Sequence, residues 1–143
     1  GTVTHVGPTG AGQLAKLANQ LIVGIGIGAV AEALLLAEAG GADPAAVARA
    51  LQGGFADSTV LRQHGQRMLT RSFAPGAHVT TQIKDLATAS GFADRHGLRL
   101  PLLDLAKALY ESAATHGLAE RDHSALYLEI ARLARERAAT GDR

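Results

Sequence analysis

Residues 10–39 read GAGQLAKLANQLIVGIGIGAVAEALLLAEA, and this stretch decides the fold. Its apolar residues recur at helical spacing and predict one helix over residues 12–39, more than twice the usual length of about 11–12 residues. The middle of the stretch, residues 22–28, is apolar on every side, which predicts a helix buried all round. Each glycine in a helix costs about 1 kcal/mol relative to alanine, so we expect another backbone to lie close to these glycines.

The rest of the chain shows the start and stop signals of further helices. Asp43-Pro44 and Asp122 are typical of helix starts, and Gly97 is typical of a helix end. The predicted helices cover residues 44–52, from 57 or 58 to 69, from 80 or 81 to 96, 101–116, and 122–139. Residues 1–7 form a short strand or an extended lead-in, followed by a turn. We therefore predict an all-α fold, with a lead-in at residues 1–12, one helical domain at residues 13–139 and a disordered tail at residues 140–143.

Composition narrows the class of protein. The 143 residues include no cysteine, and 14 basic against 13 acidic residues give a net charge of +1. With three Phe, two Tyr and no Trp, the chain has neither the charge nor the aromatic rings of a nucleic-acid binder. The apolar run at residues 21–31 is too short to span a bilayer, and Glu32 follows it, so we expect no membrane partner. The chain starts at Gly1 with no signal peptide, which favours a cytoplasmic fragment of a longer protein.

One polar face interrupts the apolar opening helix. Lys16, Asn19 and Gln20 stand at i, i+3 and i+4, so they share one side of it. A solvated stripe on a surface helix would look the same. Because Leu14 and Leu17 flank the lysine and leave little of the helix exposed, we favour Lys16 as a catalytic proton donor.

Other motifs are less specific. Gly24, Gly26 and Gly28 do not follow a strand and turn, so close packing explains them better than a dinucleotide fingerprint. The six histidines lack the spacing of metal ligands and have no obvious carboxylate partner, so we predict no metal site. His96 and His116 stand in the last turns of predicted helices, where capping is the usual role.

Several segments together resemble a known family. They are Gly10-x-Gly12-Gln13-x-x-Lys16-x-x-Asn19, Ala31-Glu32-Ala33-Leu34, Gly53-Gly54, Ser58-Thr59-Val60-Leu61, Phe73-Ala74-Pro75-Gly76, Ile83-Lys84-Asp85-Leu86, Leu100-Pro101-Leu102 and Asp122-His123-Ser124-Ala125-Leu126. In this order they look like the C-terminal domain of the β-hydroxyacid dehydrogenases. That family includes 3-hydroxyisobutyrate dehydrogenase and 2-hydroxy-3-oxopropionate (tartronate semialdehyde) reductase. The resemblance covers residues 7–133 and implies the helical fold of the 6-phosphogluconate dehydrogenase C-terminal domain.

The resemblance also implies an activity and a set of site residues. Lys16 matches the catalytic lysine, Asn19 and Gln20 match substrate-binding amides, and Lys84 and Asp85 match positions near the cofactor. The cofactor would be NAD or NADP, held mainly by a Rossmann domain that this chain lacks. The substrate would be a small hydroxyacid or its oxo form, and the assembly a homodimer or a higher homo-oligomer.

Two alternatives to this reading stay open, and one residue departs from the family pattern. Many members carry an aromatic residue after Pro-Gly, where this chain has Ala77. One alternative is a non-catalytic helical interaction module of the same fold. The other is a relative of the iminium or 6-phosphogluconate enzymes, although the sequence shows no Arg-His cluster for a phosphate.

Overall fold

A computed structural model of the protein describes the backbone of residues 1–139 and the side chains of residues 1–136. The described part contains six α-helices and no strand: α1 Ala11–Ala39, α2 Pro44–Leu51, α3 Thr59–Thr70, α4 Val79–Arg95, α5 Pro101–Ala113 and α6 Leu126–Ala139. Two short turns of other helix types, Ala114–Leu118 and His123–Ala125, connect α5 to α6. The all-α prediction is confirmed. The predicted tail, residues 140–143, lies outside the described residues.

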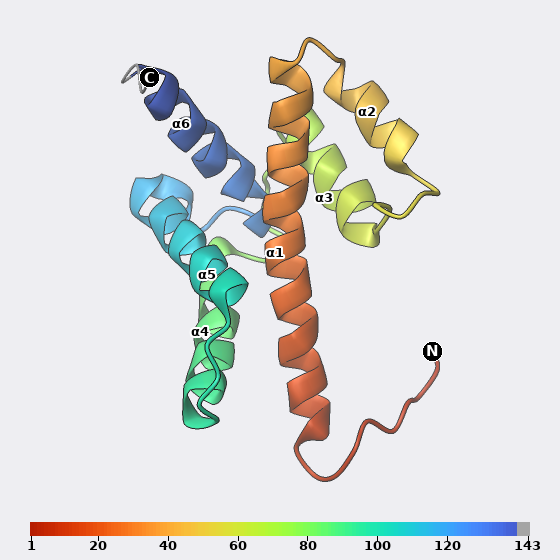
Figure 1. The fold of residues 1–143 in the computed structure, drawn as a ribbon, viewed down its shortest axis with the longest axis vertical. Coiled ribbons are helices and arrows are strands. Elements are labelled where there is room, and N and C mark those ends of the chain that lie inside the picture. The colour runs from red at the N-terminus through yellow and green to blue at the C-terminus, as the bar shows by residue number, and fades with distance from the viewer. Residues whose placement is uncertain (140–143) are drawn as a thin grey trace.

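Helix α1 runs the length of the molecule, and the other helices pack on two sides of it (Figure 1). In that view α2 and α3 lie on one side and α4, α5 and α6 on the other. The N-terminal residues join α1 at its lower end in the view. The core forms where both groups meet the second half of α1, around Ile27, Ala31 and Leu34. The first turns of α1 extend beyond this core and pack mainly beside α4.

Local signals set most helix boundaries within one or two residues of the prediction. Ser58 rather than Asp57 caps α3, since its hydroxyl accepts a hydrogen bond from Leu61 N at 2.9 Å. Asp43 caps α2 through Ala45 N at 3.1 Å. The predicted helix 101–116 is wrong at its end: α5 stops at Ala113 and a π-type turn follows. Residues 1–6 have no regular secondary structure, which agrees with a lead-in but not with a strand.

The prediction that α1 is buried all round is wrong for this chain. Only Gly24, Ile27, Val30, Ala31 and Leu34 are buried in α1. Ile22 is 70% exposed and Leu36 is 76% exposed. The physical reason is that five shorter helices cover two sides of the middle of α1 and leave the rest of its apolar surface open.

The length argument against a membrane span also fails. At 29 residues, with a mean hydropathy of 2.0 in its most apolar window, α1 is long and apolar enough to cross a bilayer. A single such helix is weak evidence, because the core helix of a water-soluble protein can have the same length and composition.

Of the three glycines at residues 24, 26 and 28, close packing explains Gly24 alone, and a side chain rather than a backbone lies against it. A Cβ at residue 24 would stand 2.7 Å from Gln82 Nε2. A Cβ at residue 26 would stand 3.5 Å from Val60 Cγ1, and one at residue 28 would stand 3.8 Å from Leu126 Cδ2. Only Gly24 is therefore required by the space around it.

Candidate active site

A groove between the start of α1 and the middle of α4 brings three of the predicted site residues together. It has a volume of about 280 Å³ and is lined by Gln13, Lys16, Leu17, Gln20, Asp85 and Thr88. The polar groups come from two faces that the helical periodicity fixes: Lys16 and Gln20 are one turn apart on α1, and Asp85 and Thr88 are one turn apart on α4. The groove therefore holds an amine, an amide and a carboxylate.

Hydrogen bonds link the predicted amides to the carboxylate. Asn19 Nδ2 donates to Gln20 Oε1 at 3.2 Å, and Gln20 Nε2 donates to Asp85 Oδ2 at 2.8 Å. Gln20 is thus held by its neighbour on α1 and by α4. Asp85, expected beside the cofactor, here contacts a residue expected to bind substrate.

The surroundings of Lys16 differ from the sequence expectation. Lys16, Leu14 and Asn19 are exposed in this chain, so its apolar neighbours do not enclose the amine. The reason is the one given for α1 as a whole: within the described residues only α4 approaches these first turns. Lys84 is also exposed and does not line the groove. It precedes Asp85 by one residue, so its side chain leaves α4 about 100° around the helix from that of Asp85.

A second and larger cavity adjoins the first. Its volume is about 520 Å³, and it shares Gln13, Leu17 and Thr88 with the first groove. It continues to residues that include Pro8, Leu14, Phe92 and Arg95. An open channel with apolar walls, one arginine and the Lys16 amine therefore runs along α1 and α4 toward the N-terminal lead-in.

The residue after Pro75-Gly76 does not face this channel. Gly76 N and Ala77 N both donate to Asp122 Oδ1, at 3.1 and 3.2 Å, so this loop is tied to the start of the His123–Ala125 turn. Phe73, the aromatic residue nearest in sequence to Ala77, is 5% exposed and lies in the core, so it does not replace the family's aromatic side chain in the channel.

A buried polar cluster lies behind Gln20, and no motif or spacing in the sequence pointed to it. Gln82, 1% exposed, donates from Nε2 to the backbone oxygen of Gln20 at 3.0 Å, and its Oε1 lies 3.0 Å from His123 Nδ1. Because Gln82 donates with one end, its other end must accept, so His123 Nδ1 carries the hydrogen. The His64 ring meets the His123 ring edge to face, with centroids 4.6 Å apart.

Burial disfavours the protonated form of both histidines. Burial, and then the neighbouring His64, lower the pKa of His123 to about 4. Burial also lowers the pKa of His64, against the opposing effect of Asp122. Burial disfavours ionisation of Asp122, but hydrogen bonds from Ser124, Ala77 and Gly76 outweigh it and lower the pKa of that carboxyl.

His64, Asp122 and His123 offer ligand atoms within 4.8 Å of one another, close enough to raise the question of a metal ion. The prediction that no carboxylate pairs with a histidine is wrong here, since His64 Nδ1 lies 4.0 Å from Asp122 Oδ2. However, Asp122 already accepts two hydrogen bonds at each oxygen, from Gly76, Ala77 and twice from Ser124. A cation would have to displace one of them, so the geometry favours a structural cap. No spacing rule could find this group, because α3 and the turn before α6 bring it together.

The histidines at the helix ends behave as predicted. His96 Nδ1 lies 2.9 Å from Phe92 O, and His116 Nδ1 lies 2.8 Å from Ser112 O. His116 additionally faces Glu129 at 3.2 Å, a carboxylate partner that the sequence did not reveal.

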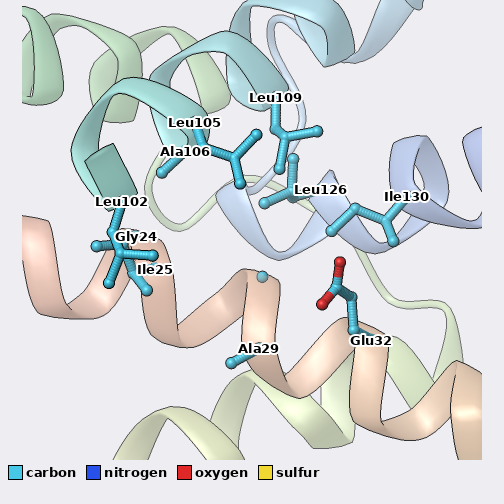
Figure 2. A pocket seen from close by; sticks show the side chains of 11 residues that line it. Gly24, Ile25, Ala29, Glu32, Leu102, Leu105, Ala106, Leu109, Leu126 and Ile130 are labelled. Atoms are coloured by element: carbon cyan, nitrogen blue, oxygen red, sulfur yellow. The ribbon is translucent and has the colours of Figure 1, made fainter.

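A third cavity, of about 220 Å³, lies on another side of α1 and has a different character. Figure 2 shows Leu102, Leu105 and Leu109 of α5, with Leu126 and Ile130 of α6, facing α1 across it. Glu32 is the one charged residue in its lining. Since Leu102 is 64% and Leu105 is 58% exposed, this groove leaves large apolar side chains open.

Comparison with known proteins decides the family. The family described as "NAD-binding of NADP-dependent 3-hydroxyisobutyrate dehydrogenase" matches residues 10–130. The chain belongs to this family. The matched region contains the whole of α1 and every residue of the groove around Lys16.

Individual relatives agree with this assignment. The chain is 46% identical over 124 residues to the 2-hydroxy-3-oxopropionate reductase of Escherichia coli (strain K12), covering 87% of this chain and 42% of the relative. It is 38% identical to the probable 3-hydroxyisobutyrate dehydrogenase-like 1, mitochondrial, of Arabidopsis thaliana, covering 93% of this chain and 40% of the relative. The chain thus spans about two fifths of the length of these curated relatives.

Solved structures confirm the helical domain. The 3-hydroxyisobutyrate dehydrogenase of Salmonella typhimurium superposes with a TM-score of 0.83 at 27% identity, over 89% of this chain and 45% of that one. The Mycobacterium tuberculosis 3-hydroxyisobutyrate dehydrogenase, solved with L-serine, superposes with a TM-score of 0.82 at 26% identity, over 91% of this chain and 47% of that one.

Proposed function

We propose that the chain is the substrate-binding and dimerisation part of an NAD(P)-dependent oxidoreductase that interconverts a small 3-hydroxyacid and its oxo form. One observation carries the proposal: Lys16, Gln20 and Asp85 line a single groove in a chain of the 3-hydroxyisobutyrate dehydrogenase family. The similarity to 2-hydroxy-3-oxopropionate reductase favours that class of substrate. The names of the relatives support an oxidoreductase, and the cytoplasmic location stays a prediction.

The chemistry assigned to this chain is proton transfer. A nicotinamide cofactor, when bound, supplies the hydride. In the reducing direction the Lys16 ammonium donates a proton to the oxygen of the reacting carbonyl, and in the oxidising direction the amine takes the proton back. Asn19 and Gln20 would orient the substrate by amide hydrogen bonds. Asp85 holds Gln20 in place through the bond at 2.8 Å.

The residues present suit the edge of a nicotinamide site and not its dinucleotide cradle. Asp85 places a carboxylate in the groove, whereas Lys84 is exposed on another side of α4. Residues 1–139 contain no glycine-rich turn between a strand and a helix, which is the usual cradle for a pyrophosphate. We infer that another part of the full-length protein binds most of the cofactor and closes over the exposed Lys16.

The exposed apolar groove of Figure 2 supports a homodimer. It lies beside the middle of α1, away from the channel that leads to the N-terminal segment, so a second copy could cover it without blocking the catalytic groove. The alternative function, a non-catalytic helical interaction module, uses the same surface but gives Lys16 no role.

The test is Lys16→Ala in the intact, full-length protein, with 2-hydroxy-3-oxopropionate and NADH or NADPH. Loss of the proton donor should lower kcat by about 10²–10⁴-fold. Lys107→Ala is the matched control, because Lys107 is on α5, pairs with Glu111 at 3.1 Å and does not line the groove. Full activity in the Lys16 variant would remove the residue from catalysis. A wild-type protein that dimerises but reduces no such substrate would favour the interaction module.

A further inference from the structure

The turn of α1 from Gln20 to Gly24 receives two buried hydrogen bonds from other helices. Gln82 Nε2 on α4 donates to Gln20 O at 3.0 Å, and Tyr110 on α5 donates from its hydroxyl to Gly24 O at 2.9 Å. Both donors are almost fully buried, at 1% and 0% exposed. Hydrogen bonds are directional, unlike apolar contacts, so each bond holds its own point of α1: Gln20 against α4, and Gly24, one turn further on, against α5.

Only the bond from Gln82 ends on a residue of the candidate active site. Gln20 is held twice by α4: its backbone oxygen by Gln82, and its side-chain amide by Asp85 at 2.8 Å. Gln82 and Asp85 are three residues apart, so they lie on one face of α4, and both form hydrogen bonds with Gln20 of α1. A shift of α1 at this point would move Lys16, one turn earlier, together with Gln20.

His123 forms a hydrogen bond with the other end of the Gln82 amide and so supports the orientation in which Gln82 donates to Gln20 O. Its Nδ1 lies 3.0 Å from Gln82 Oε1; because Gln20 O can only accept, the amide turns Nε2 to Gln20 O and Oε1 to His123, which donates from Nδ1. Gly24 makes the approach possible, because a Cβ at that position would be only 2.7 Å from Gln82 Nε2. The amide is thus enclosed, oriented and satisfied at both ends.

We propose that Gln82, oriented by His123, is a positioning residue for the reaction: it sets the place of Gln20 and Lys16 against Asp85 without touching the substrate. The inference rests on the proposed function of the groove. A displacement of the order of 1 Å in such a geometry can lower the rate of the chemical step by about 100-fold.

Two variants of the full-length enzyme test the proposal. Gln82→Met keeps the volume and removes both bonds, and Gln82→Glu keeps the shape but sets an acceptor against Gln20 O. Each should lower kcat by about 10–100-fold and change KM much less. Tyr110→Phe is the matched control, since it removes the neighbouring buried bond to α1 without touching Gln20. It should lower the melting temperature to a similar degree and leave kcat within about two-fold of wild type.

The outcomes are distinguishable from failure of the proposed function. A kcat within two-fold of wild type in either folded Gln82 variant, or an equal loss in Tyr110→Phe, would overturn the positioning role. If the wild-type enzyme reduces no 3-oxoacid, the proposed function fails. Crystal structures of wild type and Gln82→Met then decide the inference alone: loss of the Gln20–Asp85 bond supports it, and retention overturns it.

Discussion

Replacing Gly24 by alanine tests the closest contact between α1 and α4. A Cβ at residue 24 would lie 2.7 Å from Gln82 Nε2 and 3.4 Å from its Cδ. The first distance is far inside an ordinary contact, so the Gln82 amide would have to move. Because that amide is buried and bonded at both ends, it cannot move without releasing Gln20 O, His123 or both.

The expected magnitude is a balance of two effects. Alanine in place of glycine in a helix is worth about 1 kcal/mol of stability. Against this, a lost hydrogen bond costs about 0.5–1.5 kcal/mol, and a buried group left without a partner costs about 1–3 kcal/mol. We expect a net loss of about 1–3 kcal/mol in the free energy of unfolding. For a protein of this size that corresponds to a melting temperature lower by roughly 3–10 °C.

The assay is thermal and urea unfolding followed by circular dichroism, with Gly26→Ala as the matched control. A Cβ at residue 26 would meet Val60 Cγ1 at 3.5 Å, an ordinary contact, so that variant should be about 1 kcal/mol more stable than wild type. If Gly24→Ala is stabilised as much as Gly26→Ala, then Gln82 does not occupy the space beside Gly24 and the reasoning is refuted.

Three further outcomes follow from named contacts. The pKa of His123 is about 4 in the folded protein against an ordinary 6.5, so the contribution of this residue to the free energy of unfolding should not change above pH 6.5 and should fall by about 3 kcal/mol at pH 4. Urea unfolding measures this loss, and His123→Asn should reduce it. Ser58→Ala removes the bond to Leu61 N and should cost about 1 kcal/mol in urea unfolding; no loss would argue against this cap. Leu105→Glu, on the exposed apolar groove, should convert a dimer to a monomer in analytical ultracentrifugation, whereas an unchanged dimer would exclude this surface.

The helices were predictable from sequence because their signals are local. Asp43, Ser58 and Gly97 act on groups within a few residues of themselves, and the structure confirms all three positions. Two helix boundaries are misplaced by more than two residues: α5 ends at Ala113 and not at His116, and α6 begins at Leu126, after a short 3-10 turn, and not at Asp122. The turn at Ala114–Leu118 wraps a glycine at φ +88, and the sequence pattern up to His116 does not distinguish that turn from a continuing helix.

The candidate site was predictable in part. Helical spacing placed Lys16 and Gln20 on one face, and this could be read within one element. The bonds from Gln82 and Asp85 to Gln20 span 62 and 65 residues, so no spacing within one segment could reveal them. Burial of α1 was overestimated because an apolar segment shows that a surface should be covered and does not show which chain covers it.

The polar contacts of α1 resolve an ambiguity that its apolar pattern creates. Residues 22–28 alternate bulky aliphatic side chains with glycine, so a small slide along the helix axis would exchange similar surfaces at little cost. Apolar burial is nondirectional and cannot by itself select one axial position. The bond from Gln82 to Gln20 O can, since it is lost by a slide of one residue and leaves a buried group unpaired. The bond from Tyr110 to Gly24 O holds the next turn of α1 against α5. A fully apolar core at this level would bury as much surface, but it would leave the position of Lys16 relative to Asp85 undetermined.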